Sequence, residues 1–387
     1  MLISISDAFL TAPDVRDMGH FCDAMNNLLL AHRHGQHLLA IERPVIDWLL
    51  GSNLSEQSMG MLRSLKTQAL NVRSAQDWVT ESILVVPESG VRTRWDRTTC
   101  RVPWGWFTSP ISISPSRLIG EDVDRDVAIY LALANGYAAQ EHLRVHLSGQ
   151  GGGGSQTGSN LRNEARKGII ALAIVDSDRK SPMEKLGDTA WAACKAAAEV
   201  GALRCDEDSE GDRHALPQGP FESAISRLIV LRVRELENLL PHDLWERALS
   251  DPASRARLGH LLTLGFVGED ETRWVDLKQG LLCQKTLGET AEAHALRTLL
   301  EHPRCSSVPL SCGTREACTR PDESPCSRRL VDGLGPKALA EVARVLDGTA
   351  ARETLKSTLP STTSFAELHR VLRIIAEWGL AYSPSRT

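Results

Sequence analysis

The sequence predicts a mixed α/β protein in which a central domain with a mostly parallel sheet is flanked by α-rich N- and C-terminal regions. Between residues 116 and 241, short apolar runs alternate with helical segments, and these runs are apolar throughout, as in parallel strands covered on both faces. On both sides of this stretch, apolar residues recur with helical period. We therefore divide the chain into residues 1–112, 113–245 and 246–387.

Composition places the chain among folded soluble proteins. It has 387 residues, of which 42% are hydrophobic and 24% charged, and no stretch approaches the ~18 uninterrupted apolar residues of a membrane span. The start, MLISISDAF, lacks the basic and apolar parts of a secretory signal. A formal net charge of −5 excludes a global positive field, so any contact with nucleic acid must be local. We expect a cytoplasmic protein with no membrane contact.

The N-terminal region is expected to be α-rich, with a strand or two. Apolar residues have helical spacing over 21–29 and 45–49, and 83–86 suits a short strand. Prolines and glycines between 87 and 116 then mark a connector to the central domain.

The N-terminal region also contains a group of three acids and a group of three histidines, neither of which requires a functional site. Three acids would suit a PIN-like nuclease fold, but the helical spacing around them does not require it. Three histidines lie close together in a polar stretch, so we expect them on a solvated face rather than in a core. These residues are Asp7, Glu42 and Asp47, and His32, His34 and His37.

Three predicted strands of the central domain end in acidic residues. Asp176 and Asp178 follow the strand ALAIV at spacing i, i+2, which puts both carboxylates on one side of an extended chain. Glu121 ends the strand RLIGE, and further acids follow it into a helix. Because parallel strands end at one edge of their sheet, these side chains should meet there. The candidate metal ligands are Glu121, Asp124, Asp126, Asp176, Asp178, Glu235 and Glu237.

A cluster of carboxylates needs compensating positive charge. Two of them ~4 Å apart repel by several kcal/mol, so several together favour a bound cation. Oxygen ligands without histidine or cysteine favour Mg²⁺ or Mn²⁺ over zinc, and such ions act on phosphate esters. Arg179 and Lys180 directly follow the aspartates, where a cation could stabilise charge on a scissile phosphate. A solvated turn explains these two residues equally well.

The order of these motifs resembles the Toprim domain, which occurs in topoisomerases, primases and OLD-family nucleases. GED at 120–122 is similar to the Toprim glutamate motif, and DSD at 176–178 to its Asp-x-Asp motif. RELENLLP at 234–241 resembles the Glu-Asn segment of OLD-like proteins. The resemblance covers roughly 115–245, about a third of the chain. In OLD-like sites a second acid often follows the first by four residues, whereas Asp124 and Asp126 follow Glu121 by three and five.

The resemblance implies a metal-dependent nuclease that hydrolyses DNA or RNA by a two-metal mechanism, in defence against phage. Its catalytic residues would be Glu121, Asp176, Asp178 and Lys180. OLD nucleases carry an ATPase on the same chain, but no GxxxxGK[ST] motif is present here. We therefore expect a separate ATPase or SMC-like partner, and a homodimer is compatible with the resemblance.

Other interpretations stay open. One is a flavodoxin-like or other parallel α/β domain without a metal, and another is a non-catalytic regulatory or scaffold subunit with a degenerate Toprim fold. Strand passage would need a tyrosine nucleophile, yet of the three tyrosines Tyr130 and Tyr137 lie within a predicted helix and only Tyr382 lies elsewhere. The glycine run 151–154 suits either close approach of a phosphate or a flexible loop.

The C-terminal region contains a cysteine-bearing, helix-poor stretch at 303–328. A long loop inside a compact domain usually needs a structural cross-link such as a bound zinc ion. The CxxC spacing that is typical of zinc sites is, however, absent from this stretch. A structural zinc site and free thiols are therefore both retained as interpretations, with Cys283 as a substitute ligand. Beyond it, GLGPKALAEVARVLDG at 333–348 resembles a phosphate-binding helix-hairpin-helix turn, although such turns are common. The candidate zinc ligands are Cys305, Cys312, Cys318 and Cys326.

Overall fold

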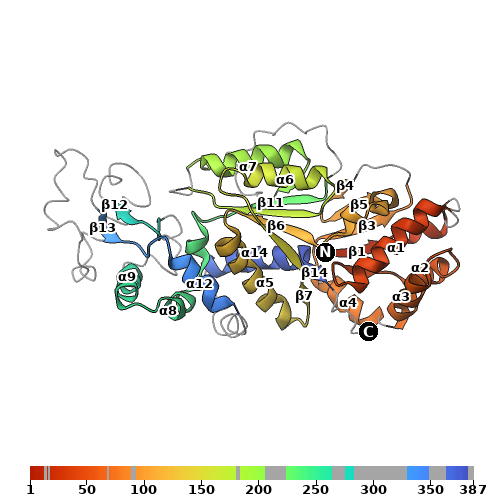
Figure 1. Cartoon of the computed structure of the whole chain (residues 1–387), viewed down its shortest axis with the longest axis horizontal. Coiled ribbons are helices and arrows are strands. Elements are labelled where there is room, and N and C mark those ends of the chain that lie inside the picture. The colour runs from red at the N-terminus through yellow and green to blue at the C-terminus, as the bar shows by residue number, and fades with distance from the viewer. Residues whose placement is uncertain are drawn as a thin grey trace.

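The protein is a mixed α/β structure with two mostly parallel five-stranded sheets (Figure 1). No helix within the described ranges is long and apolar enough to cross a membrane. The computed structural model describes residues 1–12, 15, 18–67, 69–88, 93–179, 184–204, 224–263, 275–282, 329–347 and 363–381.

The N-terminal region holds more strands than its sequence pattern indicated. Its sheet has the order β2-β1-β3-β5-β4, and all pairs are parallel except β4 with β5. Strands of three to five residues, such as LISI, are too short to display a period that separates strand from helix. The strands are β1 (Leu2–Ile5), β2 (Leu38–Ala40), β3 (Ser82–Val86), β4 (Arg94–Asp96) and β5 (Thr99–Pro103).

Helices of the N-terminal region cover this sheet, and two of them coincide with the predicted helical stretches. The first of these buries Phe21, Met25 and Leu28 against the sheet, which accounts for their spacing. The helices are α1 (Gly19–Arg33), α2 (Arg43–Leu49), α3 (Glu56–Thr67) and α4 (Ala69–Trp78).

The central sheet is entirely parallel and has the order β10-β11-β9-β6-β8. In sequence order this is 2-1-3-5-4, whereas a flavodoxin-like sheet has 2-1-3-4-5. The exchange places β11 directly beside β9, so that the acidic segments after these two strands become neighbours. The strands are β6 (Ser116–Gly120), β8 (Leu147–Gly151), β9 (Ala171–Val175), β10 (Leu203–Arg204) and β11 (Ser226–Val230).

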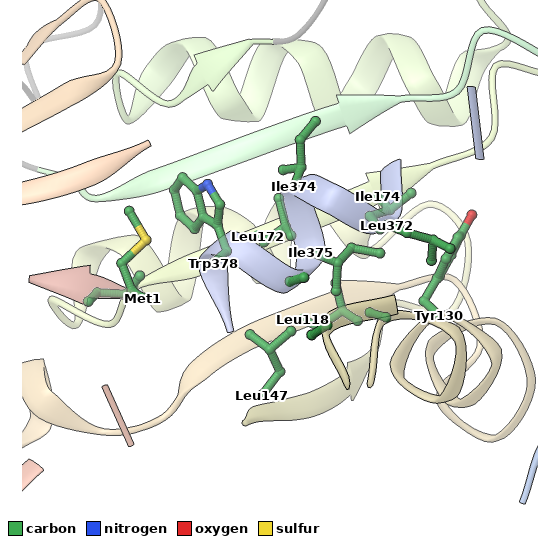
Figure 2. Packing of buried hydrophobic residues seen from close by; sticks show 14 of the residues in the cluster. Met1, Leu118, Tyr130, Leu147, Leu172, Ile174, Leu372, Ile374, Ile375 and Trp378 are labelled. Atoms are coloured by element: carbon green, nitrogen blue, oxygen red, sulfur yellow. The ribbon is translucent and has the colours of Figure 1, made fainter. Parts of the chain in front are cut away.

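Helices cover both faces of the central sheet, which explains why β9 is apolar throughout. Ala171, Ala173 and Val175 pack with α6 (Thr157–Arg166) and α7 (Asp188–Glu199). Leu172 and Ile174 point to the opposite face, toward α5 (Ala128–Gln140) and α14 (Thr363–Trp378) (Figures 1 and 2). All five residues of β9 are buried.

The C-terminal helix α14 is part of the shared core rather than a peripheral element (Figure 2). Leu372, Ile375 and Trp378 are fully buried in the same cluster as residues of both sheets. The Trp378 indole donates to Glu81 Oε2 at 2.8 Å, and Glu81 is ion-paired with Arg227 at the start of β11. This contact joins the N-terminal region, the central sheet and the last helix.

Two small antiparallel pairs complete the described fold. β7 (Arg144–Val145) pairs with β14 (Leu380–Ala381). β12 (Gly280–Leu282) pairs with β13 (Arg329–Asp332), which leads into α12 (Ala338–Leu346). Between β11 and β12 lie α8 (His242–Ala248) and α9 (Pro252–Thr263).

Candidate functional site

The carboxyl ends of β6, β9 and β11 lie at one edge of the central parallel sheet, and hydrogen bonds from backbone amides join the segments after β9 and β11. Asp178 N donates to Arg234 O at 3.1 Å, and Leu236 N donates to Asp176 Oδ1 at 3.1 Å. These bonds tie the segment after β9 to the segment after β11. Asp178 has a positive φ of 55°, a conformation that costs energy for a non-glycine residue and is common at functional sites.

Carboxyl groups crowd this edge, and burial together with neighbouring charges raises the pKa values of several of them. Burial raises the pKa of Glu121 to about 7, helped by the charges of Asp178 and Asp126. Burial and the charge of Glu237 raise the pKa of Glu235 to about 8. The pKa of Asp176 also lies well above its usual range, because of burial and then of Glu121 and Glu237. The acidic cluster consists of Glu121, Asp126, Asp176, Asp178, Glu235 and Glu237.

A single π-helical turn at 123–127 brings Asp126 into this cluster. Val127 N donates to Asp122 O at 3.0 Å, which is an i to i+5 bond, so one turn contains an extra residue. Because of this extra residue, Asp126, five residues after Glu121, occupies the position that a residue four after Glu121 would occupy in a regular α-helix. Its Oδ2 accepts from Asp122 N at 3.0 Å, which fixes the side chain.

Asp124, also predicted as a ligand, lies on the exposed side of the same turn and not in the cluster. Its neighbour Asp122 caps the turn, with Oδ1 accepting from Asp124 N at 2.9 Å and Oδ2 accepting from Arg125 Nε at 2.7 Å. The structure therefore brings together six of the seven predicted carboxylates.

A lysine from the C-terminal region lies among the acids, and the sequence pattern did not indicate it. Lys278 Nζ is 3.1 Å from Glu237 Oε1, and Glu237 is only 2% exposed. Burial alone would lower the pKa of Lys278, but the charges of Glu237 and Glu235 outweigh it and raise that pKa. Lys180, the predicted cation, lies outside the described residues. The only signal for Lys278 in the sequence is a cation beside an acid in VDLKQG, which is too common to single out.

The glycine run extends the sheet instead of forming a free loop. Gly152 N donates to Gly120 O at 2.6 Å, and Gly153 N donates to Glu121 O at 2.8 Å. A Cβ on Gly152 would lie 2.8 Å from Thr157 Cα and even closer to its hydroxyl group. This close packing fixes the backbone of Glu121 at the sheet edge.

The other features singled out in the sequence are the candidate zinc cysteines, the hairpin-like turn and the tyrosines. The four candidate zinc cysteines and Cys283 lie outside the described residues. In the turn that resembles a helix-hairpin-helix, Leu334 N and Gly335 N donate to the carbonyls of Leu277 and Lys278 at 2.9 and 3.0 Å, so these amides are engaged within the protein. Tyr130 and Tyr137 are both buried, at 2% and 8% exposure, which disfavours either as a nucleophile for strand passage.

The spacing of the acids bears on how many ions they could hold. Among the described residues, the one group of three whose ligand atoms all lie within 4.8 Å of each other is His242, Asp243 and Glu246 on α8. There the imidazole is 3.1 Å from Glu246 and 3.5 Å from Asp243, as in an ordinary helix-surface ion pair. Within the described part of the chain, no three carboxylates of the acidic cluster approach one another this closely, so the cluster is more widely spread than the group on α8.

The corresponding edge of the N-terminal sheet is closed by aromatic rings. Phe21 lies 5.7 Å from Phe9, 5.8 Å from Trp48 and 5.7 Å from Trp104, measured between ring centroids. Asp7 and Glu42 follow β1 and β2 but are exposed. Asp47 is engaged by Lys66. This region therefore has a parallel sheet, yet its acids do not converge as those of the central sheet do.

A scan against protein-family models matched none, and searches of curated proteins and of solved structures also returned no match.

Proposed function

We propose that this protein is a Toprim-type, metal-dependent nuclease that hydrolyses phosphodiester bonds at the carboxyl edge of its central sheet. The observation that supports this proposal is the convergence of six carboxyl groups from three strand ends, with raised pKa values in Glu121, Asp126 and Glu235. Such crowding is unfavourable in the protein alone and favourable around divalent cations.

The acidic cluster fits divalent cations in its donor chemistry. Glu235 Oε2 is buried and has no hydrogen-bond partner among the described residues, so it is available as a ligand. Hard oxygen donors favour Mg²⁺ or Mn²⁺. When bound, a pair of such ions would activate a water molecule and stabilise the leaving oxygen of the phosphodiester. The residues that would hold them are Glu121, Asp126, Asp176, Asp178, Glu235 and Glu237.

The protein's own groups would supply the remaining charge and rigidity. The side chain of Lys278 is 37% exposed, so its ammonium group could face a phosphate while it contacts Glu237. It would stabilise negative charge that develops on the phosphate oxygens. The hydrogen bonds from Leu236 N to the Asp176 carboxylate and from Asp178 N to Arg234 O would keep the ligands in place during turnover.

The wider biological setting of this proposal derives from the motifs alone. GED, DSD and RELENLLP resemble OLD-like proteins, and on that basis we propose DNA as the first substrate to test, RNA as the second, and phage defence as the role. The same resemblance suggests a separate ATPase or SMC-like partner and a homodimer. A structural zinc ion at the C-terminal cysteines belongs to this set of proposals.

The proposal is tested by incubating purified protein with Mg²⁺ or Mn²⁺ and with double-stranded DNA, single-stranded DNA or RNA. We expect cleavage of at least one substrate that a chelator stops and excess metal restores. Asp176→Asn protein purified in parallel controls for contaminating nuclease. If the protein binds Mn²⁺ but cleaves none of the three, the nuclease proposal is wrong and a regulatory or scaffold subunit is favoured.

Gly187→Ala is expected to weaken Mn²⁺ binding by about 10- to 100-fold, the range typical of changes beside a metal ligand. Gly187 has an ordinary φ of −62°, so alanine causes no backbone strain. Its Cβ would, however, lie 2.8 Å from Asp178 Oδ2 and closer still to Asp178 Cβ, which displaces that carboxylate. Isothermal titration with Mn²⁺ measures the effect.

The control is Gly60→Ala, where an added Cβ meets nothing within 4 Å. This variant should bind Mn²⁺ like the wild type. Equal affinities for all three proteins would show that Asp178 is not a ligand.

A further inference from the structure

The loop that carries Lys278 is fastened on two sides. Toward the sheet edge, Arg234 Nη2 donates to Asp276 Oδ2 at 3.2 Å, and Asn238 Nδ2 donates to Val275 O at 2.9 Å. Within the loop, Gln279 N donates to Asp276 Oδ1 at 2.7 Å, and Gly280 N donates to Asp276 O at the same distance. Asp276 is buried, with 3% exposure, so it acts as an internal anchor.

The other side of the loop rests on the glycine turn 333–335. Leu334 N donates to the carbonyl of Leu277, and Gly335 N donates to the carbonyl of Lys278 itself. A Cβ on Gly333 would lie 2.5 Å from Lys278 O and nearer still to Gly280 N. Only glycine permits this approach, because every atom met is backbone and none can rotate away.

The same turn also reaches the β6 side of the acidic cluster. Arg125 Nη1 donates to Pro336 O at 3.3 Å, and Arg125 is held by Asp122, which directly follows Glu121. Contacts from 331–336 therefore extend both to the Lys278 loop and to the turn behind Glu121. A segment more than 150 residues after the predicted Asp-x-Asp motif thus borders the site on two sides.

We propose that Asp276 and Gly333 are positioning residues that act through Lys278. Asp276 fastens the 275–280 loop from within and Gly333 supports it from the other side, and we call this pair of contacts the clasp. This inference rests on the proposed nuclease function and adds that the C-terminal region completes the site. The glycine turn, which resembles a DNA-binding hairpin, serves in this proposal to aim an ammonium group at the acidic cluster.

The first test follows the position of Lys278 and needs no nuclease activity. Brief acetylation with an N-hydroxysuccinimide ester, read by mass spectrometry, compares Lys278 with the surface residue Lys167 as internal reference. We expect Lys278 to be labelled at least about fivefold faster in Gly333→Ala and in Asp276→Ala than in the wild type, because contact with Glu237 is lost. Gly259→Ala, whose Cβ meets nothing within 4 Å, should leave labelling unchanged.

The second test is a double-mutant cycle on cleavage rate. Lys278→Met is expected to lower the rate about 10²-fold, and Gly333→Ala about tenfold or more through misplacement of the same group. If Gly333 acts through Lys278, the double variant is no slower than Lys278→Met alone within about twofold. Multiplying effects would overturn the clasp.

The two tests separate failure of the clasp from failure of the nuclease proposal. Unchanged Lys278 labelling in soluble Gly333→Ala and Asp276→Ala proteins overturns the clasp, whatever the activity. Faster labelling in a protein without any cleavage supports the clasp as structure and rejects the nuclease. If Gly333→Ala does not fold, both the labelling and the double-mutant cycle are carried out with Asp276→Ala instead. This substitution loosens the loop from the opposite side without introducing a clash.

Discussion

Asp176→Asn is expected to lower the metal-dependent cleavage rate by about 10³-fold, or about 4 kcal/mol in activation free energy. The substitution removes one negative charge from the centre of the acidic cluster while keeping the shape of the side chain. The amide oxygen can still accept from Leu236 N, so the local backbone should hold. Rates measured on the substrate that the wild type cleaves fastest give the comparison.

The stability of Asp176→Asn distinguishes lost chemistry from lost folding. Burial and the neighbouring acids Glu121 and Glu237 raise the pKa of Asp176, which means that its charged form is unfavourable in the folded protein. Replacing it with a neutral amide should therefore leave the free energy of unfolding, measured without divalent ions, equal to or above that of the wild type.

The matched control is Asp124→Asn. It removes the same charge from the exposed face of the π-helical turn, outside the acidic cluster, so we expect a rate within about twofold of the wild type. Equal losses in both variants would mean that general electrostatics, and not ligation at the sheet edge, governs the reaction.

The local sequence is sufficient to predict which residues lie at strand ends. ALAIV followed by DSD has one plausible conformation, because five apolar residues buried on both faces must be a covered strand and the acids must then leave it. The convergence of Glu121, Asp176 and Asp178 follows from the parallel arrangement. For the central sheet, the strand pattern thus carries most of the information about the candidate site.

What the sequence pattern could not indicate depends on contacts between distant segments. Lys278 reaches the acids only because Gly333 lies against its loop, a contact across more than 50 residues that leaves no periodic signal. Whether Asp124 or Asp126 faces the site depends on a π-turn, which shifts the register by one residue. The strand order that makes β11 a neighbour of β9 is likewise a tertiary property.

The histidines of the N-terminal region show the same limit, since the expectation of a solvated face is wrong for two of them. His32 and His37 are each 1% exposed. Leu39 N donates to His32 Nδ1 at 3.2 Å, and His37 Nε2 lies 3.1 Å from Ser114 O. A polar stretch in sequence can still be internal when backbone groups pair with one nitrogen of each buried imidazole, as Leu39 N and Ser114 O do here.

Lowering the pH from 7 to 4 is therefore expected to reduce the free energy of unfolding by about 3 kcal/mol more in the wild type than in His32→Asn. Burial lowers the pKa of His32 from 6.5 to about 4, against the opposing effect of a backbone hydrogen bond with His37. Between these values the unfolded chain binds a proton that the folded protein does not. Stability is therefore lost as the pH falls through 6.5 and continues to fall toward 4.

Urea unfolding at intervals between pH 7 and 4 measures this difference. Asparagine keeps an acceptor for Leu39 N but cannot titrate, so any cavity it leaves adds an offset that is the same at every pH. His34→Asn, on the exposed side of the same stretch, is the control and should run parallel to the wild type. If the His32→Asn curve also runs parallel, His32 ionises as freely in the folded protein as in the unfolded chain. The burial of the His32 side chain, which extends from α1 to Leu39 N of β2, would then be wrong, because a buried imidazole could not accept a proton without opening the structure.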